Sequence, residues 1–458
     1  MKMTKISLAT LVAMGTLTCA NAKTTLEEAI KGTTISGYAY GQLTSMFGDD
    51  ASGSAFRSRV YANINTGAIG GFSVGTRLYA SMGGGAPNGG SFLVNSGLSK
   101  YSYSPADYMP IGLYALYGNM DFTEYGSKTT LMAGKLNIMT AFNATEWDYG
   151  YGVYASNEDI EGVKISAQIF GAWATDNSSS LPGQSSLVTE QPLYIAGVEA
   201  GGEKLAGTSV KFYVGHSTKL IDYMLATDLA YTISGVTIQT QVAVMDVDTS
   251  SKHFGPTSTY PTTNSNNLTD LSANLRGIYN VQLAYESKDV GFSAKGGFTG
   301  SFGDGYGALL NNSSFNMGGQ FWYDTLGDGA NGYGMTGAGG MKHVTGNGNG
   351  ISVHNTNIMV GYVGVAYTGV KSLKLGLDYA FVGGDNNYAL MQKGASNPSN
   401  NSKLNWDPAK SMNATFHEVS FTASYGFFDN KLTLSGLIGS TFGDLQMARA
   451  RMKVQYSF

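Results

Sequence analysis

The chain has 458 residues and a net charge of −4; only 13% of its residues are charged, whereas it has 63 glycines and 29 tyrosines. This composition favours many short strands and long turns over helices. A mildly acidic chain is poorly suited to bind nucleic acid, so we expect no nucleic-acid partner. Beyond the N-terminus there is no apolar run of the roughly 18 or more residues that a membrane-spanning helix needs.

The N-terminus has the features of an export signal. Two lysines precede an apolar stretch at 6–17, and the small-residue motif Ala-Asn-Ala follows at 20–22. We therefore expect a signal peptide over residues 1–22 and a mature chain over 23–458. The one cysteine, Cys19, lies inside this signal. Lipidation of Cys19 is the alternative interpretation, but a threonine precedes it and the cleavage motif follows at once.

From residue 33 onward one pattern recurs: about ten residues alternate between apolar and polar, and then a break follows. In the segment 55–66, Phe56 and Val60 lie on one face and Arg57 and Arg59 on the other. The same alternation occurs at 33–46, 72–82, 236–244, 275–285, 292–298, 373–381 and 432–438. It predicts strands with one apolar and one polar face rather than buried parallel strands.

The breaks alternate in length. Short breaks follow the even-numbered strands, at 67–71, 123–127, 158–162, 234–235, 287–291, 369–372 and 428–430. Most breaks after odd-numbered strands are long, at 83–110, 175–190, 248–273, 302–354 and 384–413. About 18 strands result, with the alternation of short periplasmic turns and long extracellular loops that is typical of outer-membrane barrels.

Physical chemistry explains why such strands would close on themselves. In hydrocarbon every backbone N–H and C=O must be paired, and strands achieve this only as a barrel without edges. The predicted fold is thus all-β: one transmembrane antiparallel β-barrel of about 18 strands, too wide for side chains to fill. A soluble β-sandwich or β-solenoid is the alternative, but it explains neither the alternation of short and long loops nor a last strand that ends on an aromatic residue.

The last strand, 449–458, ends on an aromatic residue. Tyr456 and Phe458 lie on its apolar face, whereas Arg449, Arg451 and Lys453 lie on the other face. In a barrel this strand pairs with the first strand, its aromatic end sits at the membrane interface, and its cations face water inside.

Three stretches resemble the major outer membrane porins of epsilonproteobacteria. They are TTLEEAIKGTTISGYAYGQL at 24–43, LMAGKLNIMTAFNATEWDYGYGVYASNEDIEGVKISAQIFGAWA at 131–174, and the final strand. The resemblance implies an integral outer-membrane barrel of 18 strands, a homotrimer in membrane lipid, and passive diffusion of ions and small hydrophilic solutes. It further implies that Phe458, with Tyr456, is the signal recognised by the barrel-assembly machinery.

In that family the third external loop folds into the pore, and here it corresponds to residues 138–150. Its acids are Glu146 and Asp148. Glu146 also matches an acid suspected of binding calcium in related porins. One or two acids fall short of the six to eight oxygens that calcium prefers, so calcium at Glu146 remains a hypothesis, and no cofactor is required.

Inward positions on the joined first, second, third and last strands predict a basic wall with tyrosines between its cations. The wall comprises Arg57, Arg59, Arg77, Arg449, Arg451 and Lys453, with Tyr38 and Tyr40 as lumen tyrosines. Acids facing such a wall would set a transverse field across the water. Polar residues are expected on any lumen wall, however. That a given arginine lines the narrowest part of the pore is therefore a separate hypothesis for each of them.

These observations favour a general diffusion porin. A substrate-selective channel of the same fold is the first alternative. A surface adhesin or structural barrel with a plugged lumen is the second, because of the long loop at 302–354; the loop at 384–413 is also predicted to be extracellular. We expect no enzymatic activity, since the sequence has no G-x-S-x-G elbow at a strand end and its histidines lack metal-site spacing.

Overall fold

The computed structural model describes residues 25–48, 53–84, 112–140, 148–174, 191–202, 205–248, 273–310, 315–320, 322, 355–386 and 414–458. The expected signal peptide (1–22) and Glu146 lie outside these residues, as do 323–354 and 387–413 of the two longest expected loops. In the described part, no helix is long and apolar enough to cross a membrane.

One short helix precedes a succession of strands. The elements are α2 (Leu26–Lys31), β1 (Thr34–Gly48), β2 (Gly53–Asn65), β3 (Phe72–Gly84), β4 (Gly112–Asp121), η1 (Thr123–Tyr125), β5 (Thr129–Asn137), β6 (Tyr149–Asn157), β7 (Val163–Ala174), β8 (Leu193–Ala200), β9 (Thr208–Ser217), β10 (Ile221–Ile233), β11 (Val236–Val247), β12 (Leu275–Ser287), β13 (Phe292–Gly303), β14 (Met359–Tyr367), β15 (Leu373–Gly383), β16 (Phe416–Phe427), β17 (Leu432–Gly443) and β18 (Met447–Ser457). Helix α2 starts with a capping box between Thr25 and Glu28.

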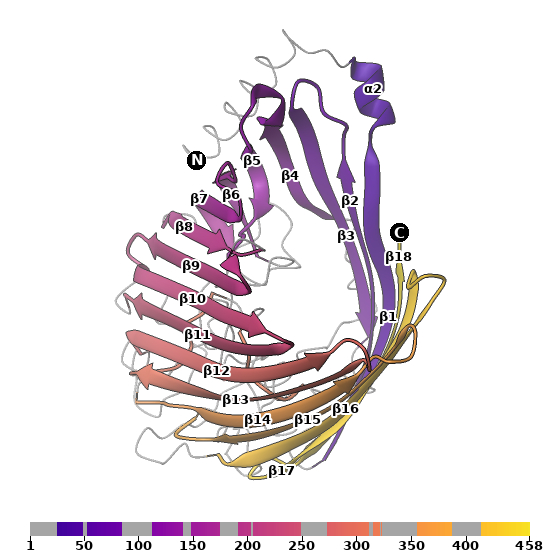
Figure 1. Cartoon of the computed structure of the whole chain (residues 1–458), viewed down its shortest axis with the longest axis vertical. Coiled ribbons are helices and arrows are strands. Elements are labelled where there is room, and N and C mark those ends of the chain that lie inside the picture. Colours follow the sequence, from indigo (N-terminus) through magenta and orange to yellow (C-terminus); the bar gives the residue numbers. More distant parts are fainter. Residues whose placement is uncertain are drawn as a thin grey trace.

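The strands form one closed antiparallel barrel. Each strand pairs with its neighbours in the sequence, and β18 pairs with β1, so the 18-stranded sheet has no edge. At the seam Tyr40 lies opposite Gln455 and Gln42 opposite Lys453, and Figure 1 shows β18 beside β1. The all-β antiparallel barrel predicted from the alternation is confirmed.

The outer surface of the barrel is apolar and its inner surface is mainly polar. On β12, Val281 and Leu283 are exposed on the outside, whereas Asn280, which precedes Val281, is buried inside. Most other strands repeat this arrangement, with large apolar side chains exposed on the outer face; β3, β5 and β6 are the exceptions among the described residues. Such an outer surface is stable in lipid and costly in water.

The strand connections at the end of the barrel where α2 lies are tied into a ring. In each case a backbone N–H donates to a carbonyl of the preceding connection: Asp121 to Gly71, Glu158 to Lys128, Gly201 to Gly162, Thr232 to Gly207, Glu286 to Gly235, Thr368 to Gly291, Gly426 to Ser372, and Ser457 to Lys431. Gly37 and Phe458 exchange two such bonds of 3.0 Å and close the ring. The terminal residue is therefore part of the seam.

Candidate functional site: the inner wall

A continuous belt of tyrosines and cations crosses the inner wall. Seven residues from seven successive strands form it, and we call them the tyrosine–cation belt: Lys453 (β18), Tyr40 (β1), Arg59 (β2), Tyr79 (β3), Tyr114 (β4), Lys135 (β5) and Tyr149 (β6). Arg59 faces inward next to the exposed Val60, and Lys453 faces inward between the exposed Met452 and Val454, as the alternation of a strand requires. The belt combines charge with aromatic faces over more than a third of the barrel wall.

Arg59 is held at the centre of the belt by two aromatic faces. Its guanidinium carbon lies 5.6 Å from the Tyr40 ring centroid and 5.1 Å from that of Tyr79. Lys453 approaches the same Tyr40 ring, at 5.3 Å. These distances are within the range of cation–π attraction, which fixes the cations while their charge still faces the lumen.

A second layer, closer to the ring of turns, reinforces the belt. Tyr38 stacks on Tyr61 with centroids 5.1 Å apart, and the Arg77 guanidinium lies 4.6 Å from the Tyr61 ring. Arg77 also donates to Asn63 (2.8 Å) and to Asn137 (2.5 Å), so it bridges β2, β3 and β5. Arg77 is thus a fixed part of the wall.

Lys135 is the most enclosed cation of the belt. Only 6% of its surface is exposed. Its ammonium group lies 4.2 Å from the Tyr149 ring centroid and 5.6 Å from that of Tyr114, and it donates to the Leu113 carbonyl at 3.0 Å. The basic wall predicted from the sequence did not include Lys135. Lys135 could have been placed on the inner face, because it lies two residues before the polar Asn137 and therefore on the same face of the strand.

The other members of the predicted basic wall lie close to the belt. Arg449 and Arg451 precede Lys453 on the same face of β18, opposite Met46 and Thr44 of β1. Arg449 is buried, and Arg451 lines a cavity of the lumen. The backbone of Arg57 pairs with Gln42 and Gly83 in the register of β2. The register thus places these arginines on β18 and β2, the two strands that pair with β1.

The expected pore loop, 138–150, is described only at its two ends; β6 already begins at Tyr149. Ile138 and Asp148 are fully buried and joined by a backbone hydrogen bond of 3.1 Å. Met139 exchanges two hydrogen bonds, of 2.9 and 2.6 Å, with the side chain of Gln168 on the inner face of β7. Both ends of this loop thus lie against the wall, and Asp148 is buried there.

A segment that sequence reasoning placed outside the barrel lies inside it. Directly after β13 the described residues are 304–310, 315–320 and 322, and we call these residues the strap. Leu310, Met317 and Trp322 belong to the cluster of buried apolar residues on the inner wall. The strap runs from β11, where Asn316 bonds Gln239 and Gln241, to β16. Inward side chains of the wall thus bind described residues of the stretch 302–354, which the sequence predicts to be an extracellular loop.

Two buried acids hold the far end of the strap. Glu418 (β16) is 0% exposed and accepts hydrogen bonds from the backbone N–H groups of Gln320 (2.6 Å) and Trp322 (2.7 Å). Asp378 (β15) is 5% exposed and accepts from the Gln320 amide at 2.8 Å. Lys295 forms an ion pair of 3.4 Å with Asp378. Glu418 and Asp378 thus lie on the part of the wall that the strap contacts, whereas the buried Asp148 lies beside Tyr149 of the belt.

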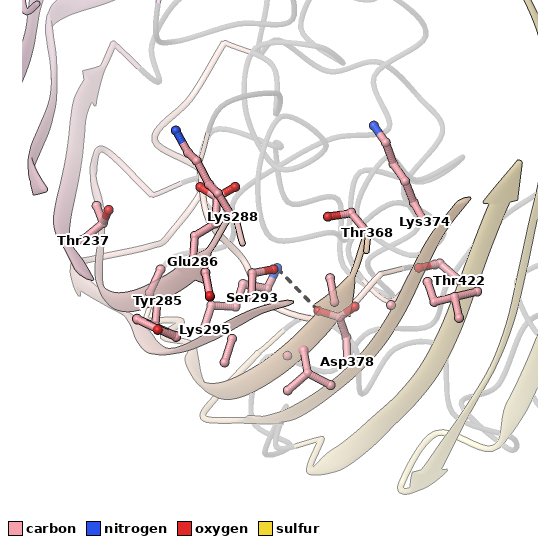
Figure 2. Close-up of a pocket in the computed structure, with 18 of the residues that line it drawn as sticks. Thr237, Tyr285, Glu286, Lys288, Ser293, Lys295, Thr368, Lys374, Asp378 and Thr422 are labelled. Carbon is pink, nitrogen blue, oxygen red and sulfur yellow. Dashed lines mark ion pairs between the residues drawn. The ribbon is translucent and has the colours of Figure 1, made fainter. Parts of the chain in front are cut away.

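A cavity of about 1070 Å³ lies between the strap and the ring of turns. Strands β12 to β16 supply most of its lining, and Gln320 of the strap also borders it. Figure 2 shows the Lys295–Asp378 pair on the cavity wall, with the ammonium ends of Lys288 and Lys374 extended away from the strands. The lining is rich in hydroxyl groups and charges of both signs, as a passage for hydrated solutes requires.

The inner wall combines cations on aromatic faces with hydroxyl groups and buried acids. In the described part of the chain, no group of three or more His, Cys, Asp or Glu side chains could hold a metal ion. Glu146 lies outside the described residues, so the structure does not test whether it binds calcium. Fixed cations on one part of the wall and buried acids on another can orient and select a solute in transit.

No protein-family model and no curated protein sequence matches the chain. Solved structures do. OpdQ of Pseudomonas aeruginosa is 10% identical, with a TM-score of 0.59 over 94% of this chain and 99% of its own. OccK2 of the same organism, in complex with glucuronate, is 10% identical, with a TM-score of 0.58 over 94% and 97%. OprD, also from that organism, is 12% identical, with a TM-score of 0.55 over 96% and 97%. At these identities the likeness establishes a common fold.

Proposed function

We propose that the chain is an integral outer-membrane channel that passes small hydrophilic solutes and favours those with a negative charge. The observation that carries this proposal is the tyrosine–cation belt. Its cations are fixed on aromatic faces of strands β18 and β1 to β6, while the buried acids that bind the strap, Glu418 and Asp378, lie on β16 and β15. A one-sided array of cations raises the local concentration of anions and orients dipolar solutes.

The shared fold supports the same proposal. OccK2 was solved in complex with glucuronate, and this chain has a similar barrel over nearly its whole length. The strap further favours selective passage over general diffusion, because it occupies part of the lumen. General diffusion remains the second candidate function, favoured by the width of an 18-stranded barrel.

Planar-bilayer recording tests this proposal. We expect single channels that prefer chloride over potassium and whose current is reduced in a saturable way by glucuronate, the solute seen with OccK2. Large ohmic steps without saturation would favour general diffusion instead. No current from correctly folded protein would refute a channel and favour a plugged structural barrel.

Assembly in the membrane follows from the seam and the outer face. We propose that Phe458 and Tyr456, whose rings lie 6.4 Å apart on the outer face, are recognised by the barrel-assembly machinery. We also propose a homotrimer with contacts near the strip Gly37, Ala39 and Gly41. The Phe56 ring lies 3.5 Å from where a Cβ of Gly41 would be, so this strip includes an aromatic side chain. Cross-linking followed by gel electrophoresis tests the trimer.

A further inference from the structure

We propose that Glu418 is a positioning residue: it holds the strap against the inner wall and thereby sets the size of solute that the channel admits. This inference rests on the proposed channel function and goes beyond it. It assigns the width of the passage to one buried carboxylate outside the belt.

The carboxylate of Glu418 and the backbone of the strap satisfy each other. Oε1 accepts from the Gln320 N–H at 2.6 Å and from the Ser420 hydroxyl at 2.8 Å, and Oε2 accepts from the Trp322 N–H at 2.7 Å. A buried charge is costly unless such donors surround it, and two buried backbone N–H groups are costly without acceptors. Removing the carboxylate therefore leaves donors unsatisfied in the strap and weakens its attachment.

The strap forms a tight turn where Glu418 binds it. Gly318 and Gly319 both have φ of +70°, a conformation that side chains with a Cβ rarely adopt. The Trp322 indole donates to the Gly318 carbonyl at 2.8 Å and packs edge-on against Phe416, with centroids 6.2 Å apart. The bond from Trp322 to Gly318 closes the turn, so the two hydrogen bonds to Glu418 fix the position of the whole turn.

This attachment places Gln320 over the cavity. Its backbone is bound by Glu418, and its amide donates to Asp378 at 2.8 Å. Gln320 is the strap residue that lines the cavity of about 1070 Å³. A solute that passes between the strap and the belt thus meets a boundary whose position depends on Glu418.

Asn316, four residues before Gln320 in the strap, has a different anchor. Asn316 binds Gln239 and Gln241, each at 2.8 Å, and its carbonyl accepts from the Thr299 hydroxyl at 2.8 Å. These contacts are between neutral groups, whereas charge-assisted hydrogen bonds such as those of Glu418 are roughly twice as strong. We therefore expect the Glu418 end to determine whether the strap stays in place.

The test compares Glu418→Ala, Glu418→Gln and Gln320→Ala with wild type in planar bilayers. Neutral polyethylene glycols of graded size serve as probes, since their entry depends on width and not on charge. Glu418→Ala should raise the conductance and admit larger polymers; Glu418→Gln, which keeps one acceptor, should do so less. Gln320→Ala should widen the passage slightly. Glu124→Ala, which removes an exposed acid from a turn, is the matched control and should change nothing.

Folding is checked by heat-modifiable migration on gels. If Glu418→Ala does not assemble, Glu418→Gln and the milder Ser420→Ala serve instead. Both should admit larger polymers than wild type, and Glu418→Gln should admit larger ones than Ser420→Ala. A cut-off and conductance equal to wild type in the folded Glu418 variants would overturn the inference. If wild type itself passes no current, the proposed function fails instead. Labelling of a Gln320→Cys variant by a water-soluble thiol reagent, faster when Glu418→Ala is added, then tests the strap attachment alone.

Discussion

Charge reversal at Arg59 is the sharpest test of the belt. A unit charge about 5 Å from a passing ion changes the ion's energy by about 0.8 kcal/mol in water, and 0.1 M salt lowers this to about 0.5 kcal/mol. Arg59→Glu changes the local charge by two units, hence by about 1 kcal/mol, with opposite sign for anions and cations. Each ion's local concentration then changes about fivefold, and their ratio by more than about tenfold.

The assay is the reversal potential in a salt gradient across a planar bilayer. Wild type should prefer the anion, and Arg59→Glu should move the reversal potential towards cation preference. Loss of the contacts to Tyr40 and Tyr79 costs about 0.5–1 kcal/mol each, which a barrel can tolerate, and gel migration verifies folding. Lys431→Gln, at an exposed turn, is the matched control. An unchanged reversal potential in folded Arg59→Glu would show that Arg59 does not face the ion path.

Other predictions concern the pore loop, the seam and one turn. Deletion of 142–148 should increase conductance if the loop narrows the passage, and an unaltered value would contradict this. Deletion of Phe458 removes the two backbone bonds to Gly37 and should reduce the amount of heat-modifiable barrel in the outer membrane; normal amounts would argue against an assembly signal. The pKa of Asp159 is lowered by hydrogen bonds from Asn157, Lys128 and Ser127. Because its folded pKa lies below the unfolded value, Asp159 stabilises the fold above the unfolded pKa, and this contribution is lost as pH falls through the folded pKa. Asp159→Asn should therefore lower the unfolding temperature at neutral pH but not in strong acid; equal lowering at both would refute the charge effect.

The strand faces were predictable because alternation is a local property. Residues such as Arg59, Tyr40 and Lys453 could be assigned to the inside from their neighbours alone. Closure of the barrel then requires β18 to pair with β1, which unites Lys453 with Arg59 through Tyr40. These steps need only the period of a strand and the absence of edges.

The composition of the belt was only partly predictable. Tyr79, Tyr114, Lys135 and Tyr149 were missed, because side chains on adjacent strands meet according to the stagger of the register, which no single strand encodes. Arg59 contacts Tyr79 diagonally, although its direct partner in the register is Ser81. The strap was missed because its apolar residues lie within a stretch of loop composition.

The sequence by itself thus determined an all-β chain with apolar and polar strand faces, a seam at the last residue and an inner wall rich in cations. Only the tertiary structure decided which tyrosines lie under which cations, and that Glu418 and Asp378 bind a strap inside the barrel. The physical reason is one of range. Face and period depend on neighbours along the chain, whereas tertiary contacts join residues that are distant in it: Glu418 binds Gln320, 98 positions away, and Lys453 near one end of the barrel sequence contacts Tyr40 near the other.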